Sequence, residues 1–215
     1  SGNSSDANGQ KTGAANTGSR PFNKLISYGI DTSSLIPQGL VEGQQAPRFQ
    51  ARTQQGDSVR LQALLNEQPL VLMFYRGQWC PVCNQYLQQL EDSVDLIRQA
   101  GARVLAITPE TAPNAAKMRA KSGTSITIIP DTAESIIEAY KVGFDVHSDY
   151  ARRIEQGFDV SIAKNNGDRK ARLPIPATYI INQDGQITWQ FFNPNYQKRA
   201  SVKAILRHLP GKPAT

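Results

Sequence analysis

The chain has 215 residues, and its 24 lysines and arginines against 18 aspartates and glutamates give a formal net charge of +6. This length fits one domain, and no apolar run approaches the roughly 18 to 20 residues that cross a bilayer, so no transmembrane segment is expected. The basic residues are scattered, and the densest group, in residues 164–172, also carries Asp168 and turn-forming residues, which argues against a nucleic-acid surface.

The first forty-five residues divide into two parts. Residues 1–20 are almost entirely small and polar, too polar to bury a core, and therefore predict a disordered leader. Residues 21–45 carry short apolar patches broken by glycine and proline. They are expected to pack as an N-terminal extension on a domain that spans residues 46–209, with a short tail at 210–215.

Regular patterning begins with a short helix near residues 61–66 and continues with the apolar run of residues 69–75. A continuous apolar run bounded by turn signals predicts a strand buried on both faces. The apolar positions after it step by four and three along one helical face: Cys83, Leu87, Leu90, Val94 and Ile97. A strand followed directly by an amphipathic helix is therefore predicted here.

Strand and helix patterns alternate further along the chain. The sequence predicts a strand at 103–107, a polar helix near 113–121, a strand at 126–129 and a helix over 132–142. This alternation predicts an α/β fold with a central mixed sheet and helices on both faces.

The last third of the chain begins with a polar stretch, residues 147–172, that is long for a connection inside a domain and is expected to border the functional site. Strands at 177–181 and 187–192 then predict a hairpin, because Asp184-Gly185 supplies the positive φ that such a turn needs. A final helix is expected at about 202–209.

The only two cysteines, Cys80 and Cys83, lie three positions apart at the start of the first long helix. A structural disulfide framework uses more cysteines, and zinc takes about four ligands, whereas His147 and His208 are far away in sequence. Redox chemistry is the remaining interpretation, with no metal and no cofactor. The alternative is that two small apolar residues simply lie near a helix start.

Position along the helix predicts different roles for the two thiols. Cys80 should lie among unpaired amides at the positive end of the helix dipole, so it is predicted to be the reactive thiolate. Cys83, one turn later on the core-facing stripe, is predicted to be the shielded resolving thiol. Pro81 fits the first turn, where its missing amide costs nothing, and restrains the loop.

The segment Phe74-Tyr-Arg-Gly-Gln-Trp-Cys-Pro-Val-Cys83 resembles the active-site segment of the peroxiredoxin-like branch of the thioredoxin superfamily, the alkyl hydroperoxide reductase and thiol-specific antioxidant type. The similarity spans residues 43–209 and includes Gly43-Gln-Gln-Ala-Pro47 and the closing Phe192-Asn-Pro-Asn-Tyr-Gln-Lys-Arg199. It implies a thioredoxin fold with a peroxiredoxin-like N-terminal extension.

The resemblance also implies substrate-binding residues. In this superfamily a cis-proline before the last two core strands faces the cysteine pair, and Pro176 matches it, so the backbone of Ile175 would be exposed to an extended substrate chain. An ordinary strand-entry proline is the alternative for Pro176. Trp79 is interpreted as an aromatic wall beside the pair, with Pro81 next to it. Arg76 either supplies positive charge to the thiolate or is solvated or paired.

Two positions depart from the typical peroxiredoxin pattern. Counted from Phe74, the peroxidatic cysteine of those proteins corresponds to Cys83, and Cys80 replaces a hydroxyl residue three positions earlier. Pro176 stands where an arginine normally enters the strand before Tyr179. Because those two groups normally orient and polarise the peroxide O–O bond, their absence favours disulfide exchange over peroxidase activity.

Three functions are therefore compared. The first is a thiol-disulfide oxidoreductase, in which Cys80 attacks a protein disulfide, Cys83 resolves the mixed disulfide, and an external dithiol donor, thioredoxin-like or a small thiol, resets the pair. The second is a thiol-dependent peroxidase that reduces hydroperoxides through a sulfenic acid. The third is a redox-inert binding module, against which the intact cysteine pair argues.

The leader bears on localisation. A polar segment rich in serine, glycine and asparagine on a redox protein is typical of the chain just after a cleaved export signal or lipid anchor. The sequence therefore predicts a periplasmic or exported bacterial protein, and a cytoplasmic protein with a polar tail is the alternative.

Overall fold

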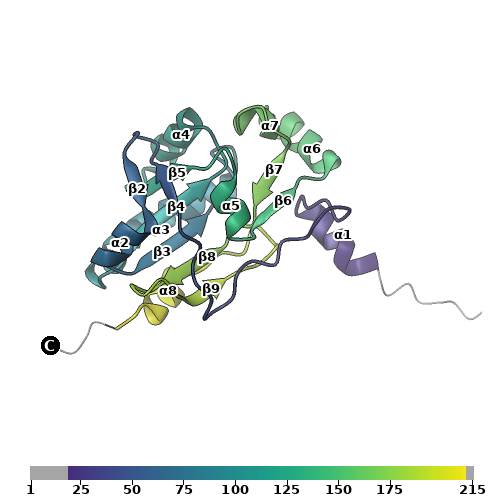
Figure 1. The fold of residues 1–215 in the computed structure, drawn as a ribbon. Helices are drawn as coiled ribbons and strands as arrows, with labels where there is room; N and C mark the ends of the chain where they lie inside the picture. Colours follow the sequence, from purple (N-terminus) through teal and green to yellow (C-terminus); the bar gives the residue numbers. More distant parts are fainter. Residues whose placement is uncertain (1–18, 212–215) are drawn as a thin grey trace, which may run out of the picture.

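The structure is a computed structural model that describes residues 19–211 (Figure 1). The leader and tail predicted at the two ends lie outside the described residues, except at their inner edges. At the N-terminal edge, helix α1 (Ser19–Ser27) already includes the last two residues of the predicted leader. No helix of the described chain has the length and apolar character that crossing a membrane requires.

A five-stranded mixed sheet forms the centre of the domain, with strand order β5-β4-β3-β8-β9. Its strands are β3 (Leu70–Phe74), β4 (Arg103–Thr108), β5 (Thr127–Pro130), β8 (Thr178–Ile181) and β9 (Ile187–Phe191). The first three are parallel, and β8 runs antiparallel to β3 and to β9. The predicted α/β fold with a mixed sheet is confirmed.

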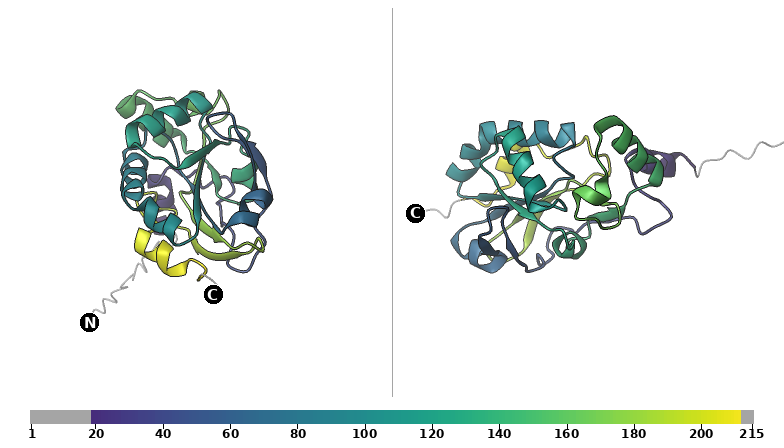
Figure 2. Two further views of the ribbon diagram at one scale, coloured as in Figure 1. Left: turned by 90° about the vertical axis from the view of Figure 1, so that its left-hand side faces the viewer. Right: turned by 90° about the horizontal axis from the view of Figure 1, so that it is seen from above.

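Helices cover both faces of this sheet, as Figure 2 shows edge-on. Helices α3 (Pro81–Gln99), α4 (Ala112–Ser122) and α8 (Val202–His208) lie on one face, and α2 (Leu61–Glu67) and α5 (Ser135–Ala139) lie on the other. A small hairpin of β1 (Gln50–Arg52) and β2 (Ser58–Arg60) precedes α2.

The α5 helix is shorter than the predicted helix over 132–142, because the backbone leaves the helical conformation on both sides of it. Glu134 and Lys141 both adopt positive φ, at 59° and 56°. The Asp131 carboxylate accepts a hydrogen bond from the Ile137 amide at 2.8 Å, which gives the first turn its acceptor. Tyr140 then turns onto the sheet.

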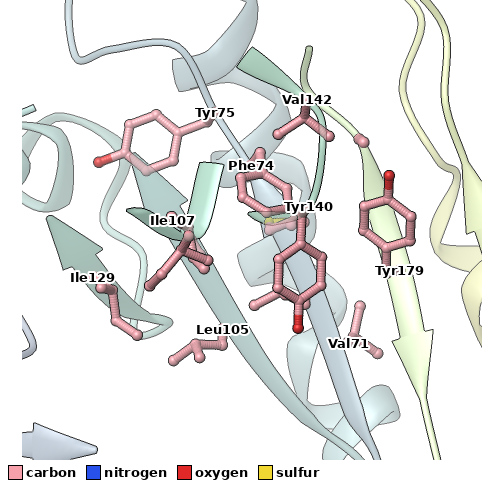
Figure 3. Close-up of a cluster of buried hydrophobic side chains, with 14 of the residues drawn as sticks. Val71, Phe74, Tyr75, Leu105, Ile107, Ile129, Tyr140, Val142 and Tyr179 are labelled. Atoms are coloured by element: carbon pink, nitrogen blue, oxygen red, sulfur yellow. The ribbon is translucent and has the colours of Figure 1, made fainter. Parts of the chain in front are cut away.

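The aromatic core lies between α5 and the sheet. The register places Leu72 of β3 opposite Leu105 and Tyr179, so these side chains share one sheet face. Tyr140 packs there with ring centroids 5.7 Å from Phe74 and 5.8 Å from Tyr179 (Figure 3). This packing fixes the carboxyl end of β3, from which the cysteine loop leaves.

Residues 143–174 form an excursion between α5 and β8. Strands β6 (Gly143–Asp145) and β7 (Arg172–Pro174) pair antiparallel, and α6 (Ser148–Phe158) and α7 (Ile162–Asn165) lie between them in sequence. Figure 1 shows this unit beyond the ends of the central strands. The stretch at 147–172 is thus largely helical and ordered, and it borders the cysteine loop as expected.

The N-terminal extension packs along this excursion and the β8–β9 turn. Ile30 pairs with Val146, and Gln45 pairs with Gln186, as isolated bridges. Between them, the Leu40 amide donates to the Tyr179 hydroxyl at 3.1 Å. Residues 30–46 therefore connect the excursion to the edge of the main sheet.

Candidate active site

Cys80 and Cys83 lie at the junction of β3 and α3. Cys80 caps α3 in an extended conformation, with φ −86° and ψ 109°, and Pro81 is the first helical residue. Both cysteines are free thiols, 2% and 0% exposed. The strand, turn and helix predicted around the pair are confirmed, and the pair is a buried dithiol at the carboxyl edge of the sheet.

The two sulfur atoms have different hydrogen-bond partners. Cys80 Sγ accepts from the Cys83 amide at 3.4 Å, as a cap does, whereas Cys83 Sγ accepts from Arg199 Nη2 at 3.0 Å. The thiols also affect each other's pKa, because hydrogen bonding from Cys80 toward Cys83 favours the thiolate form of Cys83.

These contacts separate the two thiol pKa values. Burial raises the pKa of Cys83, but the Cys80 hydrogen bond and the charges of Arg199 and Arg76 outweigh burial and hold it well below its usual value. Hydrogen bonding toward Cys83, followed by burial, raises the pKa of Cys80 well above its usual value. The cap position predicted a Cys80 thiolate, whereas the guanidinium of Arg199 in contact with Cys83 Sγ favours Cys83.

Arg76 is a buried cation beside the pair. Its side chain is 1% exposed and donates to the Tyr150 hydroxyl of α6. Its guanidinium carbon lies 4.1 Å from the ring centroid of Tyr196 and 5.1 Å from that of Trp79. Nε and Nη1 are buried without a hydrogen-bond partner in the described chain, and no carboxylate pairs with it there. Arg76 therefore supplies charge to the thiols, and the alternative of a solvated or paired arginine is wrong.

Arg199 was not predicted as a site residue. It comes from the segment after β9, and its Nε donates to the Tyr196 carbonyl at 2.8 Å, which orients the guanidinium toward Cys83. Its guanidinium carbon lies 5.3 Å from the ring centroid of Tyr86, one turn along α3. The sequence carries only one hint of this role, because Arg199 ends the closing segment by which the chain resembles its superfamily.

Glu110, after β4, holds the cysteine loop from the other side. It is 0% exposed, and its carboxylate accepts from the Gln78 amide at 2.6 Å, Asn165 Nδ2 at 3.0 Å and the Tyr75 hydroxyl at 3.3 Å. Burial raises the pKa of Glu110 to about 7, although these donors favour its charged form. One carboxyl group thus links β3, the loop and α7.

Trp79 forms a wall of the site, and Gly77 makes room for it. A Cβ on Gly77 would lie 2.2 Å from Trp79 Nε1, so only glycine fits beneath the indole. The Trp79 ring centroid is 6.4 Å from that of Phe158 in α6, and Phe158 is 46% exposed. Trp79 itself is 5% exposed, so it packs beside the thiols from within rather than on the surface.

Ile175 and Pro176 do not form the expected substrate-binding edge. The chain has no cis peptide bond among its described residues, so the bond before Pro176 is trans, its intrinsically preferred form. The Ile175 amide donates to the Val142 carbonyl at 2.8 Å, and the Ile175 carbonyl accepts from the Ala177 amide at 2.7 Å. Both backbone groups are occupied, and both residues are buried, which contradicts the prediction that they bind substrate.

Of the five residues predicted to bind substrate, only Pro81 is exposed. Trp79 and Arg76 lie beside the thiols, but both side chains are buried. Within residues 19–211, no group of three or more histidine, cysteine, aspartate or glutamate side chains could hold a metal ion. The arrangement is thus a buried pair of thiols, one of which contacts the Arg199 guanidinium, with the buried cation Arg76 beside them.

Comparisons with known proteins place this arrangement in context. The model of the AhpC/TSA family matches residues 42–190. The putative chloroplastic peroxiredoxin Q of Oryza sativa subsp. indica is 24% identical over 196 residues, which cover 91% of this chain and 79% of the rice protein.

Solved structures with the same fold are less similar in sequence. Peroxidoxin BcpB from Mycobacterium tuberculosis has a TM-score of 0.58 at 19% identity, covering 77% of this chain and 96% of that one. Peroxiredoxin Q from Xanthomonas campestris has a TM-score of 0.55 at 17% identity, covering 74% and 87%.

Proposed function

Because this chain belongs to the AhpC/TSA family, whose model covers residues 42–190, we propose that it is a thiol-dependent peroxidase in which Cys83 attacks the hydroperoxide. The observation that carries the proposal is the contact of Arg199 Nη2 with Cys83 Sγ, at 3.0 Å. It stabilises the thiolate that must attack and places a guanidinium where the alkoxide leaves.

In the first step, the Cys83 thiolate attacks the terminal oxygen of ROOH. An S–O bond forms, the O–O bond breaks, and the alkoxide takes a proton from solvent and leaves as ROH, so that Cys83 becomes a sulfenic acid. Arg199 and Arg76 stabilise the negative charge that passes from sulfur to oxygen. These two side chains take over the work of the hydroxyl and arginine that the chain lacks at Cys80 and Pro176.

In the second step, Cys80 acts as the resolving thiol. Its sulfur attacks the Cys83 sulfenic acid, an S–S bond forms, and the hydroxyl group leaves as water with the Cys80 proton. An external dithiol then reduces the internal disulfide and is itself oxidised to a disulfide. The Cys83 amide already donates to Cys80 Sγ at 3.4 Å, so the resolving sulfur lies beside the residue that it attacks.

Disulfide exchange, the first hypothesis from the sequence, receives less support. A protein disulfide would have to reach thiols that are 2% and 0% exposed. The backbone that would pair with such a substrate, at Ile175, is already bonded within the fold. The named peroxiredoxin relatives also favour the peroxidase.

The test follows tryptophan fluorescence in a stopped-flow instrument after mixing reduced protein with hydrogen peroxide. The expected second-order rate constant is at least about 100-fold above that of free cysteine, because of the two guanidinium groups. Cys83→Ser should abolish the reaction. Cys80→Ser should keep the first step and accumulate a sulfenic acid that a dimedone probe traps.

Reversed behaviour of the two variants would assign the attack to Cys80 and reject the role of Arg199. A wild-type rate no faster than free cysteine, together with rapid oxidation by a protein disulfide, would instead reject the peroxidase and return disulfide exchange to first place.

A further inference from the structure

A groove opens beside the thiolate between α3 and the segment after β9. Its volume is about 330 Å³. Among the residues that line it are Gln85, Tyr86, Gln89, Gln197, Arg199 and Ser201. Arg199 both lines this groove and donates to Cys83 Sγ at 3.0 Å, so one side chain connects the groove wall to the reacting sulfur. Both thiols are at most 2% exposed and lie behind the groove wall rather than in it.

The lining has a definite chemistry. Three glutamine amides and a serine hydroxyl supply polar groups, and Arg199 is the only charged residue among the lining residues. With Nε bonded to Tyr196 and Nη2 to Cys83, Arg199 Nη1 makes no hydrogen bond within residues 19–211 and remains a donor. The groove therefore offers hydrogen-bond donors and one positive charge, with no carboxylate to repel an anion.

The side of the groove formed by the chain after β9 is electropositive, whereas the α3 side carries the exposed Asp92 three residues after Gln89. No aspartate or glutamate follows Asp184 in the sequence, whereas Lys198, Lys203 and Arg207 lie in the same stretch as Arg199. All three are exposed, on the segment and helix that form one side of the groove. A concave site with one sign of charge raises the local concentration of the opposite ion and speeds its association.

We propose that this groove is the subsite for the organic part of the substrate, and that it selects small hydroperoxides that bear a carboxylate. The inference rests on the proposed peroxidase function and deepens it. The hydroperoxide group points along Arg199 to Cys83, and the carboxylate lies at the basic outer end. The chemistry is that of the first step above: the O–O bond breaks, Cys83 takes the terminal oxygen, and the carboxylate-bearing alcohol leaves through the groove.

The test compares two hydroperoxides that differ only in charge, cumene hydroperoxide and its para-carboxylate, in stopped-flow reactions with reduced protein. The readout is the ratio of their second-order rate constants, because any general effect on the Cys83 thiolate cancels in it. We expect the carboxylate to react about threefold faster at low ionic strength, and the preference to disappear at high ionic strength.

Gln89→Glu places a negative charge on the groove wall and should bring the ratio to about one or below. The matched control is Gln99→Glu, which adds the same charge at an exposed position on the same helix, ten residues or about 15 Å further along and outside the groove. It should keep the wild-type ratio.

The outcomes separate this inference from the function on which it rests. Rapid reaction with hydrogen peroxide but equal rates for the two cumene compounds, or a preference that Gln89→Glu leaves unchanged, would overturn the subsite alone. A wild-type protein no faster than free cysteine with hydrogen peroxide would overturn both the peroxidase and the subsite.

Discussion

Two regions of this protein handle charge in opposite ways. At the junction of α5, β6 and β7, Arg172 pairs with Glu134, Glu138 and Asp145, and Lys170 bonds Asp145 at 2.7 Å. At the cysteine pair, Arg76 and Arg199 have no carboxylate partner in the described chain, and Glu110 has no basic one there. Paired charges hold elements together, whereas unpaired ones remain available to stabilise charge that appears during a reaction.

The largest effect should come from Arg199→Met. Removal of the donor to Cys83 Sγ is expected to lower the rate constant with hydrogen peroxide by about 100-fold, the usual loss for one group that stabilises developing negative charge. The pKa of the Cys83 thiol should rise, so a pH–rate profile should recover part of the loss at alkaline pH. A uniform loss at every pH would mean that Arg199 does not lower the pKa of the Cys83 thiol.

Arg172→Met should lower stability and leave the peroxide rate constant nearly unchanged. The peroxide rate constant should stay within about twofold of wild type, whereas the free energy of unfolding should fall by about 2 kcal/mol, because Glu134 and Asp145 lose a partly buried partner. Urea denaturation checks the second value. A large drop in rate without loss of stability would show that the two regions are coupled.

Glu110→Gln should change the pH dependence of stability. Burial raises the pKa of Glu110 from 4.5 to about 7, so between these values the folded protein holds a proton that the unfolded chain has released. The contribution of the protonated Glu110 carboxyl to the free energy of unfolding is therefore fully present below about pH 4.5. It is lost as the pH rises to about 7.

The amide keeps the acceptor for Gln78 and Asn165 but cannot ionise. The wild type should lose on the order of 2 kcal/mol relative to Glu110→Gln between pH 4.5 and pH 7, measured by urea denaturation at a series of pH values. If the free energy of unfolding changed with pH in the same way in both proteins, the raised pKa of the buried Glu110 carboxyl would be wrong.

Arg76→Met is expected to have the smallest effect and tests the comparison most directly. The rate constant with hydrogen peroxide should fall about tenfold, because the second positive charge near the thiolate is lost. The free energy of unfolding should not fall, since methionine removes a buried charge that has no carboxylate partner within residues 19–211. A loss of stability as large as that of Arg172→Met would show that Arg76 stabilises the fold in the same way as Arg172.

Much of the fold could be read along the chain. The apolar run that became β3, the stepped apolar face of α3 and the Asp-Gly turn at Gly185, with φ 83°, are local patterns, and the structure confirms each of them. The α5 helix was predicted too long because Asp131 and two residues with positive φ shorten it. Such side-chain hydrogen bonds can end a helix even where the spacing of the apolar residues continues, so the apolar pattern does not show where the helix ends.

The site was predictable only in part. The sequence by itself determined that two cysteines lie one helical turn apart at the end of a buried strand, because strand, turn and helix are set by neighbours in the chain. Only the tertiary structure shows that a guanidinium contacts one sulfur and not the other. Arg199 is 116 residues from Cys83 in sequence and Glu110 is 32 residues from Gln78, yet both lie within hydrogen-bond distance of their partners. The pKa of a thiol depends on the charges that surround it in space. The spacing of residues along the chain does not show which charges those are.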